Sequence, residues 1–182
     1  MKRKRNSFFS KNYRGQIWVE TVIYTLIALV MIGLVLAFAR PKIQELQDKT
    51  IIDQSITMMK EIDSTILNLG GQGNRRIIEL GIKKGSLTLD GSRNKLFFEI
   101  ESQFEYSEPG RPISDGNLII YTEKIGSANF VNITKDYSYA YDVRFEGLDE
   151  QKILTKSSVA YKLSITNDGI ENTKTIINME LI

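Results

Sequence analysis

The stretch RGQIWVETVIYTLIALVMIGLVLAFAR, residues 14–40, decides the fold of this chain. It contains a single acidic residue, Glu20, and carries no charge from Thr21 to Ala39. About 20 predominantly apolar residues are enough for a helix to span the hydrocarbon layer of a bilayer. The stretch therefore predicts a membrane-spanning helix that has a carboxylate close to its beginning.

Charge is distributed unevenly over the 182 residues. Residues 1–15 hold six Lys and Arg and no acid, so this leader carries +6, and the net charge of +2 leaves −4 on the remainder. The positive-inside rule places such a basic cluster on the cytoplasmic side of a span. We therefore expect residues 1–15 in the cytoplasm and the chain after Arg40 outside the membrane. The acidic remainder argues against nucleic-acid binding, which needs clustered basic side chains.

The sequence contains neither cysteine nor histidine. Disulfides, thiol catalysis, the Ser-His-Asp arrangement and the usual zinc sites are therefore excluded. The Asp and Glu residues are scattered, and no spacing isolates a pair of carboxylates. We expect no enzymatic activity, no cofactor and no metal.

The basic leader and the apolar run have two simple interpretations. One is a topogenic signal for a single-span anchor. The other is a secretory signal peptide, because Ala37-Phe38-Ala39 has the small-residue pattern of a cleavage site. A secretory apolar region is usually about 7–15 residues long. The run here is longer, begins with an acid, and continues as a helical pattern beyond Ala39.

A third interpretation follows from four features taken together: the basic leader, the pair Gly15-Gln16, Glu20, and the uninterrupted apolar helix. Together they resemble the class III signal peptide of archaeal type IV pilins. The resemblance implies that a prepilin peptidase cuts the Gly15–Gln16 bond on the cytoplasmic side and makes Gln16 the first mature residue. Glu20 is then the fifth mature residue, where the family carries a glutamate. Trp18 departs from the family pattern, since a small hydroxyl residue is common at the third mature position.

A carboxylate within a membrane segment costs free energy and usually has a partner. We expect no partner for Glu20 within the apolar run. The resemblance implies that the amine freed at Gln16 pairs with Glu20, on the same or a neighbouring helix, and sets the register between stacked subunits. The alternative is that Glu20 reaches the cytoplasmic headgroups, because it lies only one turn inside the span.

An amphipathic helix is predicted after the span. Pro41 either kinks a continuous helix or begins a new one. Apolar residues then recur every three or four positions, which is typical of a helix with one buried face: Ile52, Ile56, Met59, Ile62, Ile66 and Leu69. The charged residues between them are expected on the polar side: Asp48, Lys49, Asp53, Lys60, Glu61 and Asp63. The glycine-rich segment 70–74 ends the helix, which would be roughly 80 Å long from Gln16.

Beyond Asn74 the apolar period changes from 3.6 to 2, which predicts some six to eight antiparallel strands in a sheet or small sandwich. We expect a hairpin around Asp90-Gly91 and a second around Asn167-Asp168-Gly169, and we expect the tyrosines at 137, 139 and 141 to face the core or cover the sheet. Asn132-Ile133-Thr134 is an N-glycosylation sequon, and modification of Asn132 requires an exposed position. The predicted fold is α+β, with a leader (1–15), a transmembrane helix (16–39), an amphipathic continuation (40–69) and an extracellular β-rich head (74–182).

These features favour a structural function over a catalytic one. The resemblance implies a subunit of a type IV pilus-like surface filament, stored in the membrane and assembled through its apolar helix, with a head that makes adhesive contacts. Its partners would be the prepilin peptidase, further copies or related pilins, and a pilus assembly platform. The alternative is a single-span membrane protein with an external β-rich binding domain that never polymerises.

Overall fold

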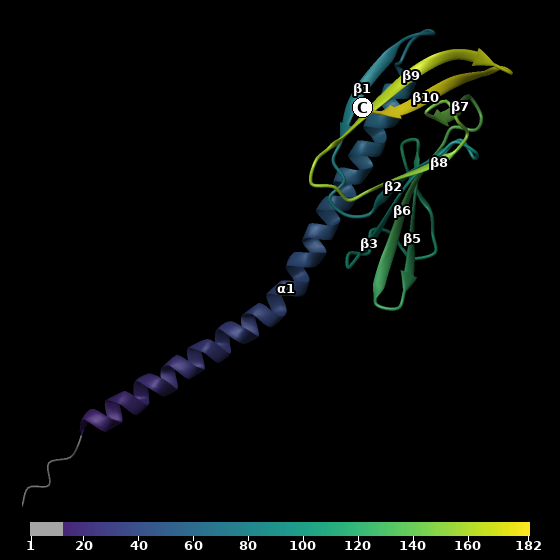
Figure 1. Ribbon diagram of the computed structural model, residues 1–182. Coiled ribbons are helices and arrows are strands. Elements are labelled where there is room, and N and C mark those ends of the chain that lie inside the picture. The colour runs from purple at the N-terminus through teal and green to yellow at the C-terminus, as the bar shows by residue number, and fades with distance from the viewer. Residues whose placement is uncertain (1–12) are drawn as a thin grey trace, which may run out of the picture. The chain divides into compact units, whose positions relative to one another are not determined.

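The computed structural model describes residues 13–182, and the side chains from residue 18 onward. One helix, α1 (Tyr13–Leu67), comes first and is followed by ten strands (Figure 1). The fold is α+β, as predicted. The chain divides into two compact units, Met1–Ile43 and Gln44–Ile182, so that α1 belongs to both.

The first unit is helical in its described part. Pro41 lies inside α1, which continues without interruption to Leu67. The alternative that Pro41 begins a new helix is therefore wrong, because the proline costs α1 one backbone hydrogen bond without ending it. The kink expected at Pro41 concerns the direction of one unit relative to the other and stays a prediction.

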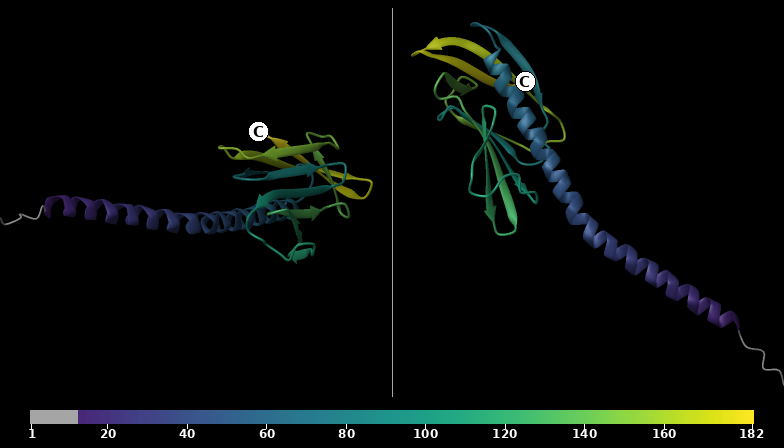
Figure 2. Two further views of the ribbon diagram at one scale, coloured as in Figure 1. Left: turned by 90° about the horizontal axis from the view of Figure 1, so that it is seen from below. Right: turned by 180° about the vertical axis from the view of Figure 1, so that it is seen from behind.

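The second unit contains the end of α1 and two β-sheets (Figures 1 and 2). Four strands form the first sheet, in the order β1 (Arg75–Leu80), β9 (Tyr161–Glu171), β10 (Lys174–Leu181), β7 (Tyr141–Phe145). Six strands form the second sheet, in the order β4 (Ile113–Asp115), β5 (Leu118–Ile125), β6 (Ala128–Asp136), β3 (Lys95–Ser102), β2 (Ser86–Asp90), β8 (Gln151–Thr155). All neighbours pair antiparallel except β10 and β7, which are parallel. The head therefore has more strands than the sequence predicted, and one parallel pair.

One hydrophobic core joins α1 to both sheets. All six residues of the predicted apolar helix face are buried, with exposed fractions of 4% or less. They meet side chains from the inner faces of both sheets, such as Leu89, Phe98 and Ile165. This confirms that the amphipathic half of the helix packs against the β-rich head. Burial of apolar surface at about 25 cal/mol per Å² is the main force that holds the helix there.

The polar side of this helix differs from the prediction at two positions. Asp48 and Asp63 are buried, with exposed fractions of 6% each, although the sequence placed both on the solvent side. Each carboxylate meets a lysine from the β-rich part: Asp48 meets Lys84, and Asp63 meets Lys135. Buried carboxylates are tolerated when they are paired and hydrogen-bonded, and these lysines supply the pairing.

The hairpin predicted around Asp90-Gly91 is confirmed by the antiparallel pairing of β2 with β3. The β9–β10 hairpin is also present, but its turn is Asn172-Thr173, where both residues have positive φ, of 48° and 74°. Two residues with positive φ are typical of a type I′ turn, which suits a two-residue hairpin loop. The segment Asn167-Asp168-Gly169, predicted as the turn, is instead an irregularity within β9, opposite the register shift between Ile176 and Ile177.

This irregularity in β9 holds the loop that follows α1. The side-chain amide of Asn167 donates to the carbonyl of Gly70 at 2.7 Å, and the backbone N–H of Gly73 donates to the carbonyl of Asn167 at 2.8 Å. Gly169 has φ +106°, and a Cβ there would lie 2.8 Å from the Gln72 amide. Gly169 in β9 and the glycines of the loop after α1 therefore serve the contact between that loop and the strand. Gly169 does not belong to a hairpin turn.

The tyrosines at 137, 139 and 141 lie in three different environments. Only Tyr141 belongs to a strand, because residues 137–140 form a turn before β7. Tyr137 is buried and meets Tyr141 edge to face at 5.9 Å between ring centroids. Tyr139 is 98% exposed. The expectation that all three face the core or cover the sheet is wrong for Tyr139, since a turn does not keep the two-residue period of a strand.

Candidate membrane and assembly surface

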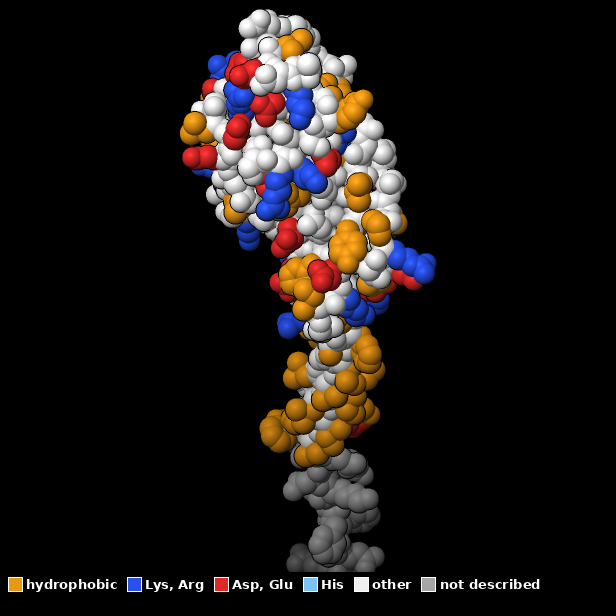
Figure 3. Space-filling view, turned by 90° about the vertical axis from the view of Figure 1, so that its right-hand side faces the viewer, with side chains coloured by type: hydrophobic (Ala, Val, Ile, Leu, Met, Phe, Trp, Pro, Cys, Tyr) orange, Lys and Arg blue, Asp and Glu red, His pale blue; other side chains and the backbone are white. Residues whose placement is uncertain are grey.

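The helix α1 presents a continuous apolar surface in its first half. Every large apolar side chain from Trp18 to Phe38 is exposed, with exposed fractions between 38% and 79%. Figure 3 shows apolar side chains covering the visible side of the helix next to the undescribed residues. The most apolar 18-residue window has a mean hydropathy of 2.7. This helix is long and apolar enough to cross a membrane, and a signal sequence near the N-terminus would share these two properties.

Glu20 has a partner inside the apolar run. The Tyr24 hydroxyl donates a hydrogen bond to a carboxylate oxygen of Glu20 at 3.1 Å. The two residues are four apart, so they lie on the same face of the helix. The expectation that the run offers no partner is therefore wrong. One phenol hydroxyl leaves further acceptor positions on the carboxylate, so Tyr24 does not replace a cationic partner.

The predicted cleavage site lies at the edge of the described chain. Gly15 and Gln16 belong to the first turns of α1, and their side chains lie outside the described residues. Most of the basic leader, residues 1–12, also lies outside the described residues. Cleavage between Gly15 and Gln16 stays a prediction.

A buried ionic cluster fastens the end of α1 to the six-stranded sheet. Lys135 Nζ, from β6, lies 3.0 Å from one oxygen of Asp63, and the Asn117 amide donates to the other oxygen at 3.1 Å. The same ammonium group lies 5.3 Å from the centre of the Tyr137 ring. The Tyr137 hydroxyl is buried without a hydrogen bond of good geometry. Two segments of the β-rich head thus converge on one helical carboxylate: the end of β6 with Tyr137, which follows it, and the turn before β5 that carries Asn117.

Burial raises the pKa of Tyr137 well above its ordinary value, and the nearby Asp63 charge raises it further. Both effects disfavour the phenolate, the first by removing water and the second by repulsion. The phenol therefore stays protonated in the folded head at pH values where an exposed tyrosine ionises.

We expect this phenol to resist alkaline titration. The ordinary tyrosine pKa is about 10, so the unfolded chain releases this proton near that pH and the folded head does not. The contribution of Tyr137 to stability is therefore present below about pH 10 and decreases as the pH rises further. Ultraviolet titration should show the same number of ionising tyrosines in the native wild type as in native Tyr137→Phe. On unfolding, the wild type should show one tyrosine more than the variant. Ionisation of all eight tyrosines in the native protein near pH 10 would contradict this assignment.

Two further residues of α1, Asp48 and Lys60, fasten the helix to the head on the N-terminal side of Asp63. Both oxygens of Asp48 are used: Lys84 Nζ donates to one at 2.6 Å, and the backbone N–H of Gln103 donates to the other at 2.7 Å. Lys60 Nζ lies 2.6 Å from Asp115, in a pair that is more exposed. The contacts at 48, 60 and 63 cover about four turns of the helix, so the end of α1 forms one body with the head.

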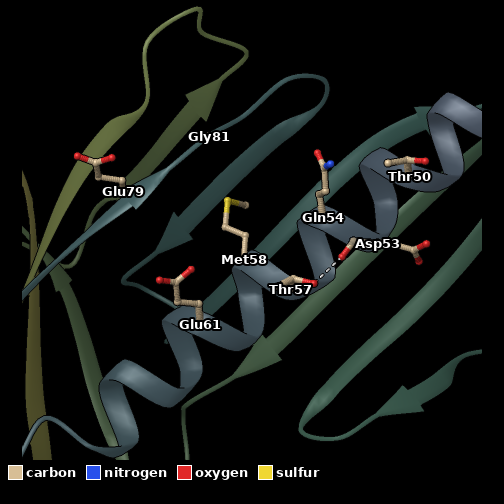
Figure 4. Close-up of a pocket in the computed structure, with 8 residues that line it drawn as sticks. All are labelled: Thr50, Asp53, Gln54, Thr57, Met58, Glu61, Glu79 and Gly81. Carbon is tan, nitrogen blue, oxygen red and sulfur yellow. Dashed lines mark hydrogen bonds between the residues drawn. The ribbon is translucent and has the colours of Figure 1, made fainter.

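A shallow groove of about 420 Å³ lies between α1 and β1 (Figure 4). Its carboxylates come from Asp53 and Glu61 on the helix and from Glu79 on the strand, and Figure 4 shows them pointing in different directions. The one hydrogen bond drawn joins the Thr57 hydroxyl to the Asp53 carbonyl at 2.9 Å. General acid–base chemistry needs groups that converge on one reacting atom, and these three carboxylates do not converge.

The sequon residue Asn132 lies on β6. Its side chain is half-buried, and the Thr134 hydroxyl donates to its side-chain carbonyl at 3.0 Å. In the ladder it stands between Glu99 on β3 and Tyr121 on β5, on the face opposite the core residues Val131 and Ile133. Glycosylation at this position stays a prediction.

A long apolar N-terminal helix followed by a β-rich head is a pilin-like architecture. Comparison with models of known protein families, with curated proteins and with solved structures finds no match to this chain. The assignment of a function therefore depends on the surfaces described above.

Proposed function

We propose that this protein is a structural subunit of a type IV pilus-like surface filament of the archaeal kind. It would be held in the membrane as a precursor, cleaved between Gly15 and Gln16, and assembled through the apolar surface of α1. The observation that carries the proposal is that surface: apolar side chains from Trp18 to Phe38 exposed on all sides of one helix, with a single carboxylate, Glu20, near its beginning.

The physical argument is that one surface suits both environments. A helix that is apolar all round is stable only when lipid or other protein covers it. Lipid chains are about as apolar as leucine, so identical helices can replace them, and close packing then supplies the association energy. A subunit with such a helix can therefore leave the bilayer for a helical bundle without exposing its apolar surface to water.

Glu20 would set the register in that bundle. Its carboxylate retains acceptor positions beyond the Tyr24 hydrogen bond, and a charge in apolar surroundings strongly favours a cationic partner. Cleavage at Gly15 would provide such a cation, the amine of Gln16. The prepilin peptidase, other copies of this chain or related pilins, and an assembly platform are the partners that this scheme requires.

The head would coat the filament. The contacts of Asp48, Lys60 and Asp63 join it to the end of α1, so the head would stay attached to a helix that is fixed in a filament core. Contacts with surfaces or other cells would then be made by the exposed faces of the sheets.

The second candidate is a single-span protein that displays the same head without polymerising. The Glu20–Tyr24 hydrogen bond favours it, because Tyr24 partly satisfies the carboxylate within a lone helix. Electron microscopy of the material sheared from cells that express this chain with a prepilin peptidase separates the two. We expect filaments that contain the chain. If all of the chain stays in the membrane fraction as single copies, the non-polymerising alternative is correct.

A further inference from the structure

A second groove, of about 480 Å³, lies where the second unit begins. Its lining includes Gln44 and Gln47 on α1 and three lysines: Lys83, Lys84 and Lys156. None of these lysines belongs to a strand. Lys83 and Lys84 lie in the connection from β1 to β2, and Lys156 follows the end of β8. We call these three the lysine groove.

The groove is held together by specific contacts. The backbone N–H of Ser157 donates to the carbonyl of Ile82 at 3.1 Å, which brings the segment of Lys156 beside that of Lys83 and Lys84. Lys84 is held by Asp48, whose second oxygen accepts the Gln103 backbone N–H. The backbone segments that carry the three lysines are therefore joined to one another, although they come from distant parts of the chain.

Two of the three charges are free to act on a partner. Lys83 and Lys156 are exposed, and within the described residues neither forms an ion pair. Asp48 is the one acidic residue that lines the groove, and Lys84 neutralises it. The groove therefore presents positive charge, which attracts anions within about one Debye length.

The short path from the apolar run keeps Gln44, which lines the lysine groove, near a bilayer surface. Gln44 follows Ala39, the last uncharged residue of that run, by five residues, which is about 8 Å along a helix. This path is an upper limit on the height of Gln44 above the hydrocarbon layer, whatever the direction of the helix. The headgroup layer is about 5–8 Å thick on each side, and a lysine side chain reaches several ångströms further.

We propose that the lysine groove binds anionic phospholipid headgroups at the membrane surface from which α1 emerges. Lys83 and Lys156 would contact the headgroup phosphates, and Lys84 with Asp48 would keep the groove in place. Each lysine near an anionic surface strengthens binding by about fivefold. The contact would hold the head against the bilayer while the subunit is stored there. The proposal depends on membrane insertion, which the proposed function shares, and not on cleavage or on filament formation.

The test uses the full chain, one copy per bilayer nanodisc. Discs of phosphatidylcholine alone are compared with discs that contain phosphatidylglycerol as well. The rate at which acetic anhydride modifies each lysine is measured by mass spectrometry. We expect Lys83 and Lys156 to react about threefold or more slowly in the anionic discs, with the difference removed by 1 M NaCl. Lys174, the first residue of β10, is the internal control and should react equally in both.

Variants sharpen the result. Lys83→Gln with Lys156→Gln should lower the attachment of the head to the anionic discs, measured by cross-linking to a photoreactive lipid, while Lys152→Gln with Lys174→Gln should leave it unchanged. Equal modification rates in both kinds of disc would overturn the proposal. The proposal would also be overturned if inorganic phosphate slowed the modification of these lysines in phosphatidylcholine discs while phosphatidylglycerol had no effect. A slower modification that appears only when a disc holds two copies of the chain would overturn it as well. Failure of the chain to enter any disc would contradict the proposed function itself.

Discussion

Glu20→Ala is expected to abolish incorporation of this protein into filaments while the chain still inserts into the membrane. Removal of the carboxylate makes α1 more apolar, so insertion is favoured. In a bundle of helices the same change removes the one charge that distinguishes one axial register from another. A loss of as little as 1.4 kcal/mol per contact changes an association equilibrium about tenfold. The amount of the chain in sheared filaments, relative to the membrane fraction, measures the effect.

Tyr24→Phe is the matched control for this experiment. It removes the hydrogen bond to Glu20 and leaves the charge, the size of the ring and the apolar surface in place. We expect this variant to assemble at close to the normal level. Normal assembly of Glu20→Ala would show that the proposed register role of the carboxylate is wrong. If Tyr24→Phe lowered incorporation into filaments as much as Glu20→Ala does, the role would belong to the hydrogen bond instead of the charge.

Asp63→Ala is expected to lower the free energy of unfolding of the head by about 3 kcal/mol. The substitution leaves the Lys135 ammonium group, which is 12% exposed, without its counter-charge, and it removes the acceptor of the Asn117 amide. An unpaired charge in such a place costs more than the lost contact itself. Denaturant unfolding, followed by circular dichroism of the purified chain in detergent, measures the change.

Lys60→Ala is the comparison at the exposed pair with Asp115, where the side chains are 47% and 39% exposed. Exposed pairs contribute at most about 1 kcal/mol, so this variant should unfold almost as the wild type does. In the Asp63→Leu background, Lys135→Met should recover much of the lost stability, because replacing both members of a buried pair is far less costly than removing one. A loss below about 1 kcal/mol in Asp63→Ala would mean that the cluster does not fasten the helix.

The sequence predicted the parts of the fold that depend on local periodicity. The apolar face from Ile52 to Leu69 was correct because helical spacing alone identifies it. The hairpin of β2 and β3 was correct because alternation and the Asp90-Gly91 signal lie within one short stretch. The carboxylates of Asp48 and Asp63 were misplaced because their lysine partners are far along the chain, and no local pattern shows which polar residue on a helix will meet a distant counter-charge.

The strand arrangement shows the same limit. The parallel pairing of β10 with β7 brings together segments about 30 residues apart in sequence, and the alternation within each strand says nothing about which neighbour it has. Asn167-Asp168-Gly169 has the composition of a turn, but its hydrogen bonds go to the loop at Gly70 and Gly73. In the candidate surface, we expected no partner for Glu20 in the apolar run, although the four-residue spacing of Tyr24 from Glu20 is a signal that could have identified their hydrogen bond.

Among all these tests, the N-terminal residue of the mature protein addresses the central claim most directly. Mass spectrometry of the chain isolated from its native cell should find Gln16 as the first residue, and substitution of Gly15 by a bulky residue should leave the precursor uncut. A terminus at Gln16 would show that the basic leader is a prepilin signal and that the apolar surface of α1 is released for assembly. A mature chain that still begins at Met1 would contradict the pilin-like function.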